Sequence, residues 1–190
     1  MYPIQSRPTN LTCEIHGIFC TVEIPLDTLD HILTAAYEKR PYLRRSLILM
    51  TTLAPDQLQN LTFDDVTSPP ITEHFVSPFL GWNTQAIKTF LAEGVPKNSL
   101  LDYRISLIAD AQTLEDDSLL FVVGYNPEEW EVVRVAGEYA NVEATRLNHG
   151  ARSIDFLIDL VDEDGVYKGV LGQPAVEELE DDAILLDGDY

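Results

Sequence analysis

The chain has few cysteines, few positive charges and no long apolar run. Two cysteines among 190 residues exclude a small fold held together by several disulfide bonds. No stretch approaches the roughly 18 apolar residues of a membrane-spanning helix, and the start carries no apolar core of signal-peptide length. We therefore expect a cytoplasmic protein without membrane association. Hydrophobic residues still make up 45% of the chain, enough for one packed domain.

Positive charge is scarce and unevenly placed. The chain has 12 Lys and Arg against 32 Asp and Glu, a net charge of −20. Residues 1–100 carry 10 acidic and 7 basic side chains, whereas residues 101–190 carry 22 and 5. Nucleic acids are excluded as partners because long-range repulsion opposes their approach. The excess of carboxylates in the C-terminal half favours a basic protein partner, and nothing in the sequence sets an oligomeric state.

Patterns that mark common catalytic and cofactor sites are missing. The sequence has no Gly-x-Ser-x-Gly motif and no glycine-rich phosphate loop, so we expect no catalytic residues of that kind and no nucleotide cofactor. The histidines have neither short mutual spacing nor cysteine partners, which argues against a metal site. They are His16, His31, His74 and His149.

Residues 11–24 alternate between apolar and polar side chains on both sides of His16-Gly17. This alternation, with a glycine at its centre, predicts a β-hairpin that turns at these two residues. The hairpin would place Cys13 opposite Cys20 on its apolar face. Two buried free thiols are favoured there, with a disulfide as the alternative.

The remaining periodicity predicts one α/β domain with a mixed β-sheet flanked by helices. The predicted order is an N-terminal extension (1–43, the hairpin and a helix), a core (44–172) and an acidic tail (173–190). The first helix is expected from Asp27 to Glu38, with its apolar face on Leu29, Ile32, Leu33, Ala36 and Tyr37. Further helices are expected at 55–61, 83–93 and 152–162, and strands at 46–53, 103–109, 119–123 and 166–171. Residues 130–135 are expected to form a strand because of their β-branched valines, with a first helical turn as the alternative.

Several of these core segments resemble one protein family. The segments are 47–52, 103–110, 119–123 and, most clearly, Asp159 to Gly169. Together they resemble a family of uncharacterised bacterial and fungal domains, known as a domain of unknown function, over residues 44–172. The resemblance implies a compact α/β fold and no known reaction. The family pattern has aspartates at the positions of Thr52 and Gly124, which implies that this chain lacks any chemistry those carboxylates perform.

Two sets of residues are candidates for binding. Residues 148–152, expected at a helix N-terminus, combine His149 with Arg152 and predict a site for a small carboxylate, with Tyr125 and Trp130 nearby. The alternative is that these residues only cap and brace a helix. Glu128, Glu129 and Trp82 are the candidates for contact with a partner.

These observations favour a non-catalytic acidic interaction protein, similar in principle to inhibitor, immunity or regulatory proteins that complement a basic partner. The alternative is a small-molecule-binding domain or minor enzyme with its site near His149, Arg152 and Tyr125. A pocket flanked by those groups would favour the second hypothesis, and an acidic face with exposed aromatic side chains would favour the first.

Overall fold

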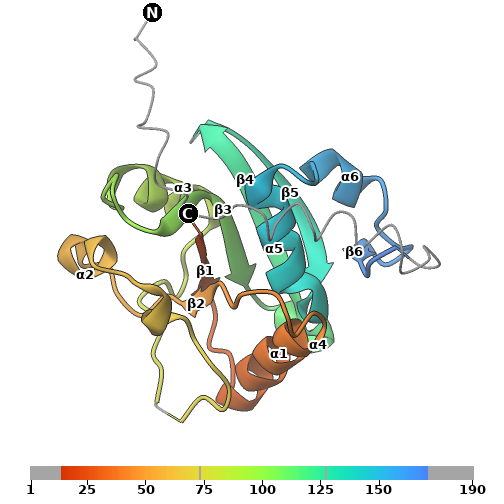
Figure 1. Ribbon diagram of the computed structural model, residues 1–190, viewed down its shortest axis with the longest axis horizontal. Coiled ribbons are helices and arrows are strands. Elements are labelled where there is room, and N and C mark those ends of the chain that lie inside the picture. The colour runs from red at the N-terminus through yellow and green to blue at the C-terminus, as the bar shows by residue number, and fades with distance from the viewer. Residues whose placement is uncertain (1–13, 73, 127, 171–190) are drawn as a thin grey trace, which may run out of the picture.

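One six-stranded mixed sheet forms the centre of the molecule (Figure 1). The computed structural model describes residues 14–72, 74–126 and 128–170, apart from the side chains of Tyr125 and Asn126. The strand order is β2-β1-β3-β4-β5-β6, and β4 alone runs opposite to the others within this sheet. The predicted single α/β domain is confirmed. The strands are β1 (Ile15–Cys20), β2 (Leu47–Leu49), β3 (Leu101–Ala109), β4 (Ser118–Asn126), β5 (Glu129–Ala136) and β6 (Val166–Tyr167).

Helices connect the strands and cover the sheet. Helix α1 packs against α5 and the short turn η2, while α5 and α3 both contact β3. The five residues predicted as the apolar face of α1 are the buried residues of that helix. The helices are α1 (Leu26–Glu38), α2 (Pro55–Gln59), α3 (Thr84–Glu93), α4 (Thr113–Asp116), α5 (Ala140–His149) and α6 (Ile154–Ile158), with 3₁₀ turns η1 (Phe63–Asp65) and η2 (Gly137–Tyr139).

The predicted N-terminal hairpin is wrong, because β1 runs straight through His16-Gly17. Every residue of β1 is buried, and the strand pairs in parallel with β2 on one side and β3 on the other. An alternating run continues its pattern whether the chain turns or goes straight, so periodicity did not separate the two structures. The segment expected to be an addition therefore supplies an interior strand of the sheet.

Gly17 is needed for close packing and not for a turn. It lies outside the set of glycines with positive φ. A Cβ atom at this position would lie 2.7 Å from the Phe19 ring and 3.0 Å from Cγ of Met50. Such distances require neighbouring side chains to move, so glycine lets them pack closely on the β1 backbone.

Cys20 ends β1 as a buried free thiol, and burial raises its pKa to about 12. This outcome agrees with the predicted thiol at Cys20. Its expected neighbour, Cys13, and the whole predicted tail (173–190) lie outside the described residues. Within the described ranges, no helix is long and apolar enough to cross a membrane.

Helix α5 was not predicted, and the helix expected at 152–162 is shorter than its periodicity indicated. Three of the seven buried residues of α5 are polar, namely Asn141, Glu143 and Arg146. Asn141 Oδ1 accepts hydrogen bonds from the backbone N–H and the hydroxyl of Ser46, both at 3.0 Å. These bonds join α5 to the start of β2.

Substitution of Gly17 tests the packing of β1. The added methyl group in Gly17→Ala should collide with Phe19 and Met50, and we expect the free energy of unfolding to fall by about 1–3 kcal/mol. Urea denaturation measures the change. A variant as stable as the wild type would contradict the close packing and would fit a glycine in open space.

Candidate functional site

The predicted carboxylate site at residues 148–152 spans the end of one helix and the connection to the next. His149 is the last residue of α5, and Gly150 ends that helix with a φ of +72°. Free carbonyl groups, and therefore partial negative charge, lie at this end of a helix. The next helix, α6, begins at Ile154 and is capped by the hydroxyl of Ser153. His149 therefore lies at the carboxyl end of α5, and the binding of a carboxylate by Arg152, which directly precedes the cap of α6, stays a prediction.

Arg152 joins a buried charged group that we call the Glu143 cluster, formed by Glu143, Arg146, Arg152 and Tyr167. Glu143 is 1% exposed and accepts hydrogen bonds at Oε1 from Nη1 of Arg146 and from the hydroxyl of Tyr167, both at 3.2 Å. The Nε atom of Arg152 lies 3.6 Å from Glu143 Oε2. His149 is exposed at the end of α5 and is not part of this cluster.

Burial and the neighbouring positive charges shift the pKa of Glu143 in opposite directions. Burial raises the pKa of this carboxyl group, while Arg152 and Arg146 favour its ionised form. Burial also raises the pKa of Tyr167, and the neighbouring Glu143 adds to this effect. Tyr167 therefore stays a neutral hydrogen-bond donor to the cluster.

The other predicted ligand-binding residues lie at the β4–β5 ribbon. Trp130 is half-buried in β5 and packs against the core. Tyr125 lies in β4, with its side chain outside the described part of the structure. A Cβ atom on Gly124 would lie 2.4 Å from the Glu129 carbonyl oxygen, so the aspartate that the resemblance expects here would not fit this ribbon.

The predicted partner-binding residues differ in their exposure. Glu128 and Glu129 are exposed where β4 turns into β5. Trp82 is half-buried instead, and its ring lies edge to face with Phe79 and Phe90 at centroid distances of 5.1 and 6.0 Å. The position of Trp82 indicates core packing more than partner contact.

A surface that the sequence did not single out lies at α6 and the loop after it. We call residues 155–164 the acidic–apolar surface. The helix ends at Ile158, so residues that the longer predicted helix would partly have buried are exposed. The exposed apolar side chains are Phe156, Ile158, Leu160 and Val161, at 36–38% exposure, and the exposed carboxylates are Asp155, Asp159, Asp162, Glu163 and Asp164.

Two open hollows lie near the carboxyl ends of β1 and β2, the edge where parallel sheets commonly bind ligands. The first has a volume of about 430 Å³ and the second about 520 Å³. His74 and Phe75 line both hollows. Polar residues of the second hollow include Thr51, Thr52, Gln57, Asn60, Asp65, Thr67 and His74. No group of three or more His, Cys, Asp or Glu side chains in the described ranges is placed to hold a metal ion.

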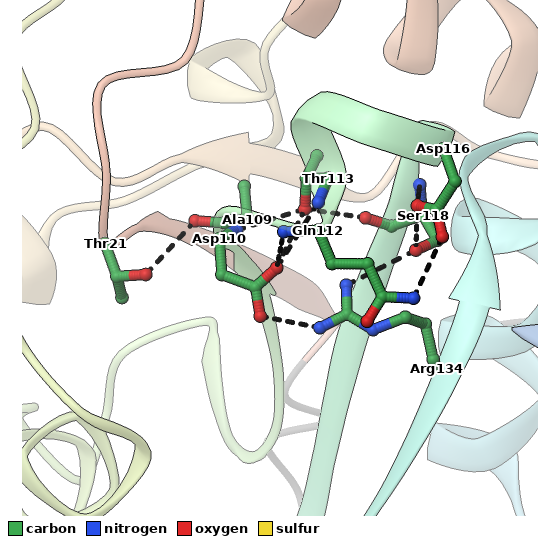
Figure 2. A network of polar contacts seen from close by, with 8 residues as sticks. All are labelled: Thr21, Ala109, Asp110, Gln112, Thr113, Asp116, Ser118 and Arg134. Carbon is green, nitrogen blue, oxygen red and sulfur yellow. Dashed lines mark hydrogen bonds and ion pairs between the residues drawn. The ribbon is translucent and has the colours of Figure 1, made fainter. Parts of the chain in front are cut away.

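A polar network ties the ends of β3 and β4 to β5 (Figure 2). Arg134 donates to Asp110 Oδ2 at 2.6 Å and to the hydroxyl of Ser118 at 3.3 Å. The Ser118 hydroxyl donates to Asp116, and the Thr113 hydroxyl donates to the Ser118 carbonyl oxygen at 2.7 Å. These groups satisfy one another across α4, so the network fixes the connection between the strands.

A second buried polar group holds β1 against β3. His16 is 1% exposed, and its Nδ1 lies 3.9 Å from Oδ2 of Asp102, which is itself fully buried. Asp102 accepts two hydrogen bonds from the Arg104 guanidinium, at 3.1 and 3.0 Å. Burial lowers the pKa of His16 to about 4, although Asp102 acts in the opposite direction. His16 is therefore neutral in the folded protein at pH 7.

Because burial keeps His16 neutral, we expect the free energy of unfolding to depend on pH. Between pH 6.5 and about 4 the unfolded chain binds a proton at His16 that the folded chain does not, so stability falls as the pH is lowered through this window. The loss is about 3 kcal/mol for a shift of this size. Urea denaturation measures the free energy of unfolding at pH 7 and at pH 4. The difference between the two values should be smaller in His16→Asn than in the wild type, while His31→Gln, at an exposed position, should leave it unchanged. An unchanged difference in His16→Asn would contradict the prediction.

Comparisons with known proteins add no identification. No family model matches the chain, and no match was found among curated proteins or solved structures.

Proposed function

We propose that this protein is a non-catalytic interaction protein whose acidic–apolar surface binds a basic protein partner. The observation that carries the proposal is the presence of four exposed apolar side chains among five carboxylates within residues 155–164. A solvated acidic helix end needs no exposed apolar residues of this size. A binding surface uses both, because apolar contacts supply affinity and charges guide the encounter.

The charge of this surface is only partly neutralised within the protein. Lys168 contacts Asp164 at 2.5 Å and Asp162 at 3.6 Å. Asp159 and Glu163 are exposed beside the apolar residues. A partner with Lys or Arg around an apolar contact would complement this arrangement. Covering such a basic site is how an inhibitor, immunity or regulatory protein acts.

The contacts of one buried titratable residue, Lys88, support a non-catalytic role. Burial lowers the pKa of Lys88 to about 8, a feature that can mark a reactive amine. Its Nζ atom, however, donates to the backbone oxygens of Tyr103, Arg104 and Gly124 at 3.3–3.4 Å. Lys88 thus fastens α3 to β3 and β4, and its three donors are used within the fold.

The second hollow supports a different candidate function, the binding of a small polar molecule. Its volume of about 520 Å³ is within the range of small-molecule sites, and it lies at the carboxyl end of β2. Its hydroxyl and amide groups suit a neutral polar ligand. This site differs from the one predicted near His149, Arg152 and Tyr125.

Binding measurements with charge and apolar variants test the interaction function. Affinity capture from an extract of the source cells would identify the partner, and binding of the purified partner would then be measured. We expect binding to weaken between 0.01 M and 0.15 M salt, because the Debye length falls from about 30 to about 8 Å. Asp159→Asn with Glu163→Gln should slow association, and Leu160→Ser with Val161→Ser should speed dissociation.

Matched variants away from the surface are the controls. Asp56→Asn with Asp64→Asn makes the same charge change at exposed positions of α2 and η1, and Leu114→Ser removes another exposed apolar side chain. Both should bind as the wild type does, as should His149→Ala. Glu128→Gln with Glu129→Gln tests whether steering extends to the β4–β5 turn. Loss of binding in His149→Ala, with normal binding in the surface variants, would contradict the proposal.

A further inference from the structure

The outer edge of β2 forms hydrogen bonds with a single residue, Thr67, that acts as part of a neighbouring strand. β2 is the last strand on its side of the sheet, so one of its edges faces away from β1. Thr67 donates its backbone N–H to the Leu47 carbonyl oxygen at 3.0 Å, and its hydroxyl accepts from the Leu49 N–H at 2.9 Å. This is the pattern of one residue in a parallel strand, with a hydroxyl oxygen in place of the carbonyl oxygen.

The next acceptor and donor along this edge are open to the second hollow. Backbone groups of successive residues in an extended chain point to alternate sides. Met50 donates its N–H to the Ile18 carbonyl oxygen of β1 at 3.0 Å, so the backbone groups of Leu49 and Thr51 point away from β1. No described residue donates to the Leu49 carbonyl oxygen or accepts from the Thr51 N–H. Leu49 and Thr51 both line the second hollow.

The spacing of this acceptor and donor defines the chemistry of a ligand. The carbonyl of Leu49 and the N–H of Thr51 match the N–H and the C=O of one amino-acid unit, which would continue the pattern of Thr67. We propose that the second hollow binds a small molecule with one acylated amino-acid unit, paired in this way with Leu49 and Thr51. The proposal rests on the second candidate function, the binding of a small polar molecule in this hollow.

The lining of the second hollow suits an uncharged ligand with an apolar side chain. No Lys or Arg is among the described residues that line it, so a ligand carboxylate would lack a cation. The Asp65 carboxylate accepts at Oδ2 from the backbone N–H and the hydroxyl of Thr62, at 2.8 and 2.9 Å. An apolar side chain would contact the apolar part of the lining. That part includes Met50, Leu58, Leu61, Ile71 and Phe75.

The open part of the edge is short, which favours a small molecule over a long peptide strand. Thr67 covers the edge as far as the N–H of Leu49, and helix α2 begins at Pro55. Only residues 50–54 lie between β2 and α2, outside any helix or turn. A strand of several residues would need a longer free edge. The volume of about 520 Å³ suits a single amino-acid unit with small groups at both ends.

The experiment follows the backbone amide resonances of the full-length chain by NMR during titration with N-acetyl-L-leucine N-methylamide. The Thr51 amide proton should move downfield and saturate, because it gains an acceptor. The Met50 amide, which donates to Ile18, should move little and is the internal control. A second titration uses the ester analogue in which oxygen replaces the leucine N–H. It should bind about tenfold more weakly, because the Leu49 carbonyl oxygen then faces an oxygen atom.

Substitution of Thr51 separates its backbone N–H from its side chain. Thr51→Pro removes the N–H, which lies on the outer edge where proline is tolerated, and should weaken binding of the methylamide about tenfold. Thr51→Ala retains the N–H and should bind within about twofold of the wild type. The comparison of amide with ester needs no variant, so it tests the proposal even if Thr51→Pro does not fold.

The outcomes separate this proposal from the functions on which it rests. Equal binding of amide and ester in the second hollow, or unchanged binding in folded Thr51→Pro, would overturn the amino-acid proposal and leave the small-molecule function standing. If neither compound moves the resonances of the lining residues, the proposal is overturned. Asp159→Asn with Glu163→Gln, which tests the acidic–apolar surface, should bind the methylamide as the wild type does.

Discussion

The rest of the fold depends on the complete burial of β1. This strand is buried along its whole length and pairs with β2 and β3, so it joins the two sides of the sheet. Its burial has two requirements. Gly17 must lack a side chain so that Phe19 and Met50 can pack on the backbone, and His16 must remain neutral beside Asp102. Both requirements constrain the sequence at positions that would tolerate many residues in an exposed turn.

Four of the 12 positive charges lie in the interior, which affects the charge of the exterior. Lys88 is 2% exposed, and the side chains of Arg146, Arg152 and Arg134 are 4%, 8% and 10% exposed. Because these cations fix α3, the Glu143 cluster and the β3–β4 connection, fewer remain to offset surface carboxylates. The exterior is therefore more negative than a uniform distribution of the net charge would make it. The exposed carboxylates of residues 155–164 belong to this exterior, and their combination with exposed apolar residues supports the proposed interaction with a basic partner.

Elements whose apolar residues repeat at regular spacing were predicted well from the sequence, whereas the helix with several buried polar residues was not. Helix α1 was found with its buried face correct, because Leu29 to Tyr37 repeat at helical spacing. Helix α5 was missed, since Asn141, Glu143 and Arg146 are buried polar residues that carry no such signal. Because α5 was not predicted, the Glu143 cluster was not expected either. For the same reason His149 was expected at the start of a helix, whereas it lies at the end of α5. The turn expected at Gly17 failed for another reason, because only tertiary contacts distinguish a straight alternating strand from a hairpin.

Native-state hydrogen exchange tests the central place of β1 most directly. Amides of β1 that donate to β2 or β3 are expected to exchange only when the whole domain unfolds, with the same free energy as global denaturation. Amides of the acidic–apolar surface after α6 should exchange much faster through local opening. Equal protection of the hydrogen-bonded amides of β1, β3 and β4, at the global free energy, is the predicted result. Exchange of β1 amides at a much lower free energy than those of β3 and β4 would contradict the account.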